Sequence, residues 1–408
     1  MGTLQIIVIG GGAAGFFGAI AAAKSHPHPQ VTILEASPQV LGKVRISGGG
    51  RCNVTHACFE PKLLVQNYPR GNKALLGAFS RFQAQDTVTW FQKHGVHLKT
   101  EADGRMFPIT DTSETITSCL VNAANAAKIK IQTRTPVNRV TYHRGKYEIT
   151  LKSGEKQECD RLLMATGSNP IGYQIAQSLG HTIISPVPSL FTFNVRDTQL
   201  NQLAGISLPN VKIKLSVPDH PGLEQTGAFL ITHWGFSGPV ILKLSAWGAR
   251  ILHQHRYQAK LQINFLPHLS PEEIRQQLIQ TKEEVPRKTM FLYRGVEIPH
   301  RLWQYLLSRA NIQEQVRWAE VSKRQINQLI TELTQGQYLV SGKGVFKDEF
   351  VTCGGVDLKE INFKTMESKI SPGLYFAGEI LDIDGITGGF NFQSAWTTGY
   401  LAGCAMAI

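Results

Sequence analysis

Residues 4–24 read LQIIVIGGGAAGFFGAIAAAK, and this stretch decides the fold. A continuous apolar run, as expected for a buried parallel strand, leads directly into Gly10, Gly12 and Gly15, after which small residues continue as a helix. Glycines at this G-x-G-x-x-G spacing make a tight turn, let a pyrophosphate approach the backbone, and let the helix pack closely on the strand. The helix N-terminus then offers unpaired N–H groups and partial positive charge to the phosphates. The stretch predicts a Rossmann-like α/β domain that binds a dinucleotide.

The next apolar run, VTILEAS at residues 31–37, supplies the acid that such a domain needs. Glu35 stands twenty residues after Gly15, where a carboxylate can bond a ribose hydroxyl. The same carboxylate would repel a 2′-phosphate, which disfavours NADP at this site and leaves NAD or FAD. A glycine turn that serves only for tight packing is the alternative.

Two later stretches choose between these dinucleotides. RLLMATG (161–167) is a second buried run that ends in glycine, and LYFAGEILDIDGITGGFNF (374–392) is a third, with an acidic loop before a helix of small residues. The acids of this loop can bond ribityl hydroxyls, and the helix N-terminus can stabilise negative charge on a reduced flavin ring. Three strand-to-glycine crossings at one edge of a sheet favour the long cofactor FAD. A hydrolase with paired carboxylates is the alternative.

Residues 47–53 read SGGGRCN, a second glycine turn with a cation and a thiol directly after it. Three residues without side chains let backbone N–H groups approach a planar ring or a phosphate. Arg51 can hold a positive charge near the pyrophosphate or the reduced flavin, and Asn53 can bond the loop to itself or to the ring edge. Cys52 has two interpretations: a small buried thiol that fills space, or a proton donor or redox thiol whose pKa is lowered by the neighbouring arginine.

The composition excludes several classes of protein. With 408 residues the chain is too long for one typical core, so two or three lobes are expected. No apolar run is long enough to span a bilayer, and no basic region precedes the apolar N-terminus as it would in an export signal. Six cysteines are scattered without paired spacing, which predicts reduced thiols in a cytoplasmic protein, with no disulfide framework and no bound metal.

The pattern along the chain changes twice beyond the glycine-rich first part. Alternating runs such as VKIKLSV and YQAKLQINFLP predict strands, and helical periodicity begins at Ser270 and Pro271, an N-cap pair. The predicted domains are a first part of the FAD-binding domain at 1–190, an inserted β-barrel-like domain at 191–269, a helical subdomain at 270–335, and the C-terminal part of the FAD-binding domain at 336–408. This sequence has no second G-x-G-x-x-G for a nicotinamide domain, so NAD(P)H would reach the flavin transiently.

The charge balance favours an anionic partner. Forty-two lysines and arginines against thirty acids give a net charge of +12 and a pI near 9.4. Basic residues are expected to concentrate in the insertion, with aromatic residues between them: Lys212, Lys214, Arg250, Arg256, Arg287, Lys288, Arg294, Arg301, Arg309, Arg317, Lys323 and Arg324, with Tyr257, Trp303, Tyr305 and Trp318. They form either a solvated helical face or a surface that tracks the phosphates of structured RNA and stacks its bases. Membrane and DNA partners are not expected.

Taken in order, the motifs resemble those of one family. GGGAAG, ISGGGRCNVTH, GRMFPIT, ATG, LGHTI, ITHWGFSGP, VTCGGV and YFAGEILDIDGITGGFNFQ stand as in the HI0933-like flavoproteins, also called the BaiN/RdsA family, over nearly the whole chain. The chain departs from the family pattern at Gly42, where relatives usually carry arginine, while an arginine appears at Arg45. It departs again in the shortened SNPIGY loop (168–173), and Cys353 occupies a position that the pattern leaves variable.

The resemblance implies a two-part Rossmann-like FAD-binding domain with non-covalent FAD. Together with the motifs it gives the candidate cofactor set: Gly10, Gly12, Ala13, Ala14, Gly15, Glu35, Ala36, Lys43, Ser47, Gly48, Gly49, Gly50, Arg51, Cys52, Asn53, Val137, Ala165, Thr166, Gly167, Gly378, Glu379, Asp382, Gly388, Gly389, Phe390 and Asn391. Val137 enters as a backbone contact to adenine. Arg51 and Cys52 are also the candidate catalytic residues.

The resemblance also implies an activity. Hydride passes from NAD(P)H to FAD and on to an electron-poor C=C bond, and the family includes reductases of conjugated double bonds and a branch similar to enzymes that form dihydrouridine in ribosomal RNA. The net charge of +12 favours the RNA branch, because a small neutral enone needs no basic lobe. The alternatives are a reductase or oxidase of a small metabolite, such as a conjugated enone or an amine, and a flavin-bearing binding protein without turnover.

Overall fold

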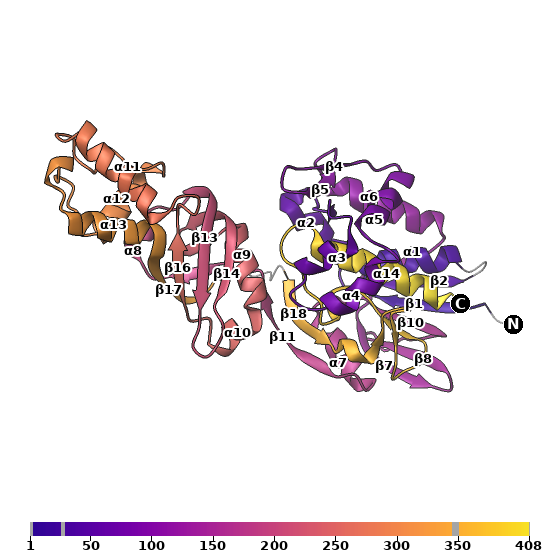
Figure 1. Ribbon diagram of the computed structural model, residues 1–408. Helices are drawn as coiled ribbons and strands as arrows, with labels where there is room; N and C mark the ends of the chain where they lie inside the picture. The colour runs from indigo at the N-terminus through magenta and orange to yellow at the C-terminus, as the bar shows by residue number, and fades with distance from the viewer. Residues whose placement is uncertain (1–2, 26–28, 345–350, 408) are drawn as a thin grey trace. The chain divides into compact units, whose positions relative to one another are not determined.

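The computed structural model describes residues 3–25, 29–344 and 351–407. The chain divides into two compact units, each described here by itself (Figure 1). The first unit joins Met1–Val187 to Val351–Ile408, and the second is Pro188–Phe350.

A seven-stranded sheet forms the centre of the first unit. Its strands, in spatial order, are β19 (Ile361–Asn362), β20 (Glu367–Ser368), β21 (Leu374–Phe376), β10 (Arg161–Met164), β1 (Gln5–Ile9), β2 (Gln30–Leu34) and β6 (Lys130–Gln132). The strands from β21 to β6 run parallel, and β19 and β20 add an antiparallel edge. Because β21, β10 and β1 are neighbours, the three strand-to-glycine crossings predicted from the sequence leave the same edge of the sheet.

Two helices of small residues pack on each other and against this sheet (Figure 1): α1 (Ala13–Ser25) and α14 (Phe390–Met406). A Cβ on Gly399 would lie 2.5 Å from the carbonyl oxygen of Ala14, and one on Gly403 would lie 2.2 Å from that of Gly18. The helices therefore cross at a distance that larger residues would prevent. Aromatic rings fill the space beside the crossing, with the centroids of Phe17 and Trp396 4.7 Å apart.

The other elements of the first unit surround the sheet. The helices are α2 (Gly42–Gly50), α3 (Pro61–Leu64), α4 (Asn72–Phe79), α5 (Ala84–Lys93), α6 (Ser113–Ala126) and α7 (Pro170–Ser178), with 3₁₀ turns η1 (Val65–Asn67), η3 (Leu358–Glu360) and η4 (Gly378–Ile380). The strands form three small sheets: β3 (Thr55–His56), β5 (Arg105–Pro108) and β4 (Leu98–Thr100); β7 (Val137–His143), β8 (Lys146–Leu151) and β9 (Lys156–Cys159); and the pair β11 (Ile183–Ser189) and β18 (Val351–Val356).

A closed six-stranded barrel forms the core of the second unit, which confirms the predicted β-barrel-like insertion. Around the barrel the strands are β12 (Phe193–Val195), β15 (Gly235–Ser237), β14 (Leu223–Thr232), β13 (Ser207–Ser216), β16 (Ala259–Asn264) and β17 (Gly336–Lys343). Buried and exposed residues alternate along β13 and β16, as expected where one face of a sheet meets a core. Phe193, Phe229 and Phe236 are almost fully buried in that core.

Helices complete the second unit. They are α8 (Thr198–Asn201), α9 (Pro239–Trp247), α10 (Ala249–Gln254), α11 (Pro271–Glu284), α12 (His300–Arg309) and α13 (Lys323–Gln335), with the 3₁₀ turn η2 (Trp318–Glu320). The predicted helix start is confirmed, since the Ser270 hydroxyl accepts the backbone N–H of Glu273 at 3.2 Å and the Glu273 carboxylate accepts that of Ser270 at 2.7 Å. No helix among the described residues is long and apolar enough to cross a membrane.

The end of the second unit lies further along the chain than the sequence suggests. Residues 336–343, predicted to begin the return to the FAD-binding domain, form β17, which closes the barrel between β12 and β16. The alternation of residues in QYLV suits a strand of a barrel as well as a strand of an α/β sheet. Only its pairing with other strands therefore shows to which unit this strand belongs. The two ends of the unit are adjacent, because Phe193 pairs with Lys343.

Candidate functional site

The three glycines of the first turn perform different tasks. Gly10 has a φ of 109°, and a Cβ there would lie 2.3 Å from the carbonyl oxygen of Ala165 on the neighbouring crossing. A Cβ on Gly15 would lie 2.0 Å from the carbonyl oxygen of Gly10, so this glycine lets α1 approach β1. At Gly12 nothing lies within 4 Å of the Cβ position. The turn is thus closed on two sides and open at Gly12, where a pyrophosphate would approach.

Glu35 lies at the end of β2, beside this turn. One carboxylate oxygen accepts the backbone N–H of Gly11 and the other that of Ser37, both at 2.8 Å. Each oxygen keeps a lone pair for a ribose hydroxyl. The backbone N–H of Thr135 donates to the Glu35 carbonyl at 2.8 Å, and this tie leads the chain to Val137, the first residue of β7. Residues predicted for the adenosine half therefore come together, with Ala36 exposed next to them.

The second turn, SGGGRCN, ends α2 in a run of left-handed residues. Gly48, Gly49 and Gly50 have φ values of 58°, 69° and 84°, a run that side chains would strain. A Cβ on Gly48 would lie 2.9 Å from the Phe107 ring, whereas those on Gly49 and Gly50 would meet nothing within 4 Å. The backbone of these last two glycines is therefore open, as an approach to a ring or phosphate requires.

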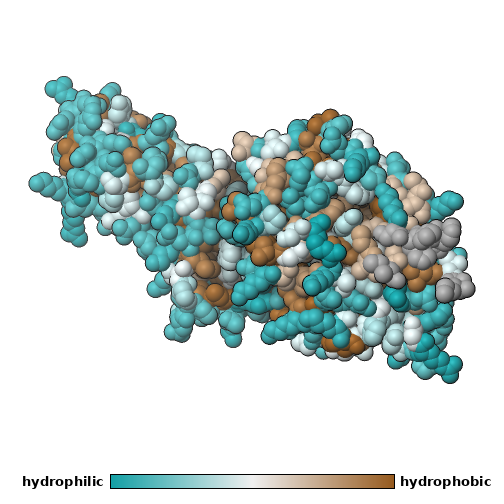
Figure 2. Space-filling view, turned by 45° about the vertical axis from the view of Figure 1, so that its right-hand side comes forward, coloured by the Kyte–Doolittle hydropathy of each residue, from teal (hydrophilic) through white to brown (hydrophobic). Residues whose placement is uncertain are grey.

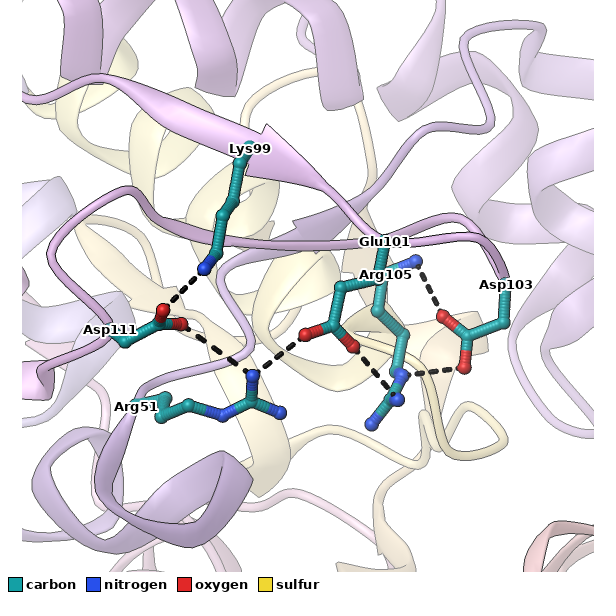
Figure 3. A network of polar contacts seen from close by, with 6 residues as sticks. All are labelled: Arg51, Lys99, Glu101, Asp103, Arg105 and Asp111. Atoms are coloured by element: carbon teal, nitrogen blue, oxygen red, sulfur yellow. Dashed lines mark hydrogen bonds and ion pairs between the residues drawn. The ribbon is translucent and has the colours of Figure 1, made fainter.

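Arg51 holds this turn to the β4–β5 hairpin through a network of charges (Figure 3). Its Nη1 lies 2.7 Å from the Glu101 carboxylate and 3.5 Å from that of Asp111, and its guanidinium lies 4.0 Å from the centre of the Phe107 ring. Lys99 pairs with Asp111, and Arg105 pairs with Glu101 and Asp103. Two carboxylates compensate the positive charge of Arg51, so its evident task is to fix the loop.

Cys52 differs from the sequence-based expectation. The residue is 0% exposed, and burial raises the pKa of its thiol to about 12. The expected lowering of this pKa by Arg51 is wrong, because that guanidinium faces Glu101 and Asp111 and burial disfavours the thiolate. This environment supports the space-filling interpretation of Cys52.

Asn53 joins the second turn to the C-terminal turn. With its amide oriented to satisfy both groups, Oδ1 accepts the backbone N–H of Gly389 at 3.0 Å and Nδ2 donates to the carbonyl of Thr55 at 3.1 Å. The sequence predicted that Asn53 bonds the loop to itself or to the ring edge, whereas in the structure the amide joins the loop to Gly389 and Thr55. The indole N–H of Trp396 donates to the carbonyl of Val54 at 2.9 Å, which fixes the same strand on α14.

The Lys43 ammonium and the Glu379 carboxylate form an ion pair between distant parts of the sequence. Lys43 also donates to the Ser168 hydroxyl at 3.3 Å, and the second Glu379 oxygen accepts the backbone N–H of Thr352 at 2.9 Å. A Cβ on Gly167 would lie 3.7 Å from the Glu379 carboxylate. The structure therefore brings together α2, the ATG turn and the C-terminal turn.

The rest of the C-terminal turn is rigid. The Asn391 amide accepts the N–H of Gly385 at 2.8 Å and donates to its carbonyl at 2.9 Å, and the Phe390 ring stacks on His56 with centroids 4.7 Å apart. Asp384 is buried in an ion pair with Arg70. Gly378, Gly388 and Gly389 have positive φ values, as such a turn requires, and Asp382 follows Gly378 in the same loop.

Two buried hydroxyls near Glu379 have no hydrogen-bond partner in the described part of the chain: Thr166 Oγ1 and Tyr173 Oη. The Thr166 hydroxyl lies against the start of α7, because a Cβ on Gly172 would lie 1.9 Å from Thr166 Oγ1. Burial, and then the charges of Glu379 and Asp382, raise the pKa of Tyr173. The sequence analysis missed Tyr173, which stands in the shortened loop. Unsatisfied buried hydroxyls and open glycine backbone are what a long polar cofactor such as FAD would complete.

The aromatic residues proposed for RNA stacking in the insertion are mostly inaccessible. Trp303 and Trp318 are fully buried and Tyr305 is 6% exposed, because they form the core of the helical part. The positive charge is shared by the two units. Pro188–Phe350 has 19 lysines and arginines against 13 acids, a net charge of +6, half of the +12 of the whole chain. The buried rings of Trp303, Trp318 and Tyr305 cannot stack on RNA bases.

Comparisons with known proteins agree with this geometry. The family model described as the HI0933-like protein Rossmann domain matches residues 4–405. The chain is 30% identical over 411 residues to a 3-dehydro-bile acid delta(4,6)-reductase of Clostridium scindens, covering 99% of both. It is 31% identical over 415 residues to a ribosomal RNA dihydrouridine synthase of Haemophilus influenzae, covering 98% of both. In fold it is similar to a 3-ketosteroid-delta4-(5alpha)-dehydrogenase of Rhodococcus jostii, with 14% identity, a TM-score of 0.52, and 99% and 97% of the two chains covered.

Proposed function

The chain belongs to the HI0933-like family of FAD-dependent oxidoreductases, and on this basis we propose that it reduces the C=C bond of a uridine in structured ribosomal RNA, giving dihydrouridine. The observation that carries the proposal is similarity over 98% of the chain to proteins named ribosomal RNA dihydrouridine synthase, from Haemophilus influenzae at 31% identity and Escherichia coli at 28%. The net charge of +12 supports an anionic substrate.

The residues of the first unit have distinct tasks in this proposal. The open backbone at Gly12 and the N-terminus of α1 hold the pyrophosphate, and Glu35 holds a ribose. Lys43, Glu379 and the unsatisfied hydroxyl of Thr166 hold the middle of the cofactor. A bound flavin supplies the hydride for the C=C bond. Asn53 keeps the two turns beside the ring in register.

The reduced substrate also needs a proton. Hydride addition to a C=C bond leaves negative charge on the neighbouring carbon, and Cys52 is the candidate proton donor from the sequence. Because its thiol is fully buried and its pKa is about 12, we propose that water or another group delivers this proton. Arg51 positions the glycine turn and does not supply the proton for the substrate. We propose NAD(P)H as the source of electrons, bound transiently.

A second candidate function rests on the relative named as a bile acid reductase, at 30% identity. In that case the substrate is a small conjugated enone, and the flavin residues keep the same tasks. A small neutral substrate gains little from the net positive charge, so the two candidates differ in their dependence on salt.

Reoxidation of the reduced holoenzyme tests both functions. The enzyme is reduced anaerobically and mixed with in vitro transcribed, hence unmodified, ribosomal RNA or with a steroid dienone, and flavin absorbance is followed. We expect RNA to reoxidise the flavin with formation of dihydrouridine, and to do so much more weakly when salt rises from 50 to about 200 mM. Reoxidation by the dienone alone, insensitive to salt, would instead identify an enone reductase.

A further inference from the structure

The connection between α11 and α12 in the second unit is held as a rigid platform. The N–H of Met290 donates to the carbonyl of Val316, and that of Trp318 donates to the carbonyl of Lys288, both at 3.0 Å. The indole N–H of Trp303 donates to the carbonyl of Met290 at 2.6 Å. Beneath the connection the Trp303 and Trp318 rings stack with centroids 6.3 Å apart. Without these hydrogen bonds, the connection could fold over and bury its own apolar side chains.

Two apolar side chains of this platform are exposed to solvent, although a buried core lies directly next to them in the same unit. Leu292 is 73% exposed and Tyr293 is 44% exposed, although the carbonyl of Tyr293 is fixed by the indole N–H of Trp318 at 3.2 Å. On the face seen in Figure 2, hydrophobic residues of the helical part stand among mostly hydrophilic ones. Two exposed apolar side chains are too few for a stable protein interface.

Three cations, Arg287, Lys288 and Arg294, stand close to Leu292 and Tyr293 in the sequence, and a fourth, Arg317, lies in the segment paired with theirs. All four are exposed, and Arg317 stands opposite Thr289 in the paired segments. Within the described residues none of the four forms an ion pair, whereas Lys212, Arg275 and Arg309 of the same unit each pair with a glutamate. The guanidinium of Arg294 donates to the carbonyl of Ile298.

A hollow lies beside the platform, lined by Phe291 and by the amide side chains of Gln304, Asn311, Gln313 and Gln315. Amides carry both donors and acceptors, which suits the edges of nucleobases. Glu314 also lines the hollow, so phosphate is less suited to it than a neutral base.

We propose that this platform, namely Arg287, Lys288, Leu292, Tyr293, Arg294 and Arg317, binds an unpaired, single-stranded segment of the RNA substrate. The cations contact phosphates, and a base stacks on the Tyr293 ring, as in proteins that hold unpaired nucleotides. The inference rests on the proposed function, since it locates the surface that the RNA substrate would use. An exposed aromatic ring near cations that form no ion pair in the described residues favours RNA. An acidic protein would need the cations but no ring on which to stack.

Binding of a fluorescent 20-residue oligouridine and of unmodified ribosomal RNA to the holoenzyme tests the proposal. The triple variant Arg287→Gln, Lys288→Gln, Arg317→Gln is expected to raise Kd at least tenfold at 100 mM salt and to reduce the slope of log K against log salt by about 2. Tyr293→Ala is expected to raise Kd about fivefold or more with an unchanged slope. Flavin content and melting temperature confirm that each variant is folded.

The matched control removes three lysines from the outer face of the barrel, Lys212→Gln, Lys214→Gln, Lys260→Gln, and should change Kd less than twofold. Equal losses of RNA affinity in both triple variants would overturn the proposed binding site and indicate that the net charge alone attracts RNA. Competition by poly-glutamate as strong as by oligouridine would also overturn it, in favour of an acidic protein. If the wild-type enzyme binds neither RNA, the proposed function fails with it, whereas tight binding untouched by the platform variants refutes the platform alone.

Discussion

Gly389 shows how a single residue can decide whether two glycine turns meet. It is the N-cap of α14 with a φ of 91°, and a Cβ there would lie 2.5 Å from the carbonyl oxygen of Thr55. The obstacle is therefore protein backbone, not only the path of the flavin ring. The backbone at Thr55 cannot move aside without breaking the hydrogen bond between the Asn53 amide and the backbone N–H of Gly389.

Gly389→Val is expected to abolish flavin binding, because the side chain both strains the backbone and separates the two turns. The ratio of flavin to protein absorbance after dialysis measures this loss. Gly42→Ala is the control, since a Cβ on Gly42 meets nothing within 4 Å and α2 keeps its helical start there. A yellow, fully loaded Gly389→Val protein would contradict the geometry.

Cys52→Ala is expected to change turnover by less than about threefold and to keep FAD, since a fully buried thiol with a pKa of about 12 neither ionises near neutral pH nor reaches a substrate. The steady-state rate measured between pH 6 and 9 should have the same profile in both proteins. A loss of on the order of a hundredfold with flavin retained would restore the thiol as proton donor.

At this scale the sequence predicted what depends on local backbone chemistry. The tight turn at Gly10 and the close packing of helix on strand at Gly15 follow from their spacing and are seen in the structure, whereas the approach of a pyrophosphate at Gly12 stays a prediction. The environment of Arg51 could not be predicted, because its partners Glu101 and Asp111 are brought near by a hairpin fifty and sixty residues further on. The burial of Cys52 depends on the same tertiary contacts.

Among the elements, the sequence of α12 contains a periodicity that indicates which of its residues are buried. Leu302, Trp303, Leu306 and Leu307 recur at helical spacing and are all buried. This periodicity marks the core face of an amphipathic helix, and it should have placed Trp303 inside. For β17 no such signal exists, because alternation suits either sheet and only its pairing with β12 and β16 assigns it to the barrel.

A buried histidine links the segment after α7 to η3 and to β20, the strand between β19 and β21. His181 lies 3.0 Å from the Glu360 carboxylate and 2.9 Å from the Ser368 hydroxyl. Since that hydroxyl accepts the backbone N–H groups of Ile370 and Ser371, it donates to His181, whose other nitrogen donates to Glu360. Burial lowers the pKa of His181 below its usual 6.5, although Glu360 opposes the shift.

Acid should therefore weaken this contact. Below pH 6.5 the unfolded chain takes up a proton at His181 more readily than the folded chain, so stability falls as the pH drops toward the lowered pKa, by at most about 1.4 kcal/mol per pH unit. His181→Asn should show a smaller drop in melting temperature between pH 7.5 and 5.5. His143→Asn, at an exposed site, is the control. Equal drops in all three proteins would assign the acid sensitivity elsewhere.

At the scale of the molecule, each unit has its own core. The apolar cluster of the second unit runs from Phe191 to Val340 and contains both the barrel interior and the buried tryptophans. We therefore expect residues 188–344 to fold when produced alone, with a cooperative thermal transition and dispersed amide resonances that do not change when FAD is added. A molten or aggregated fragment would show that this core depends on the rest of the chain.

The pairing of β11 with β18 and of β12 with β17 has an evolutionary consequence. The chain leaves the flavin-binding unit on one strand of a pair and returns on the other, so the whole of Pro188–Phe350 enters through two neighbouring points. Recombination between related genes could then replace this segment without shifting the register of the flavin-binding sheet. One ancestral redox module could in this way acquire substrates as unlike as a steroid and a nucleic acid through exchange of a single contiguous piece of gene.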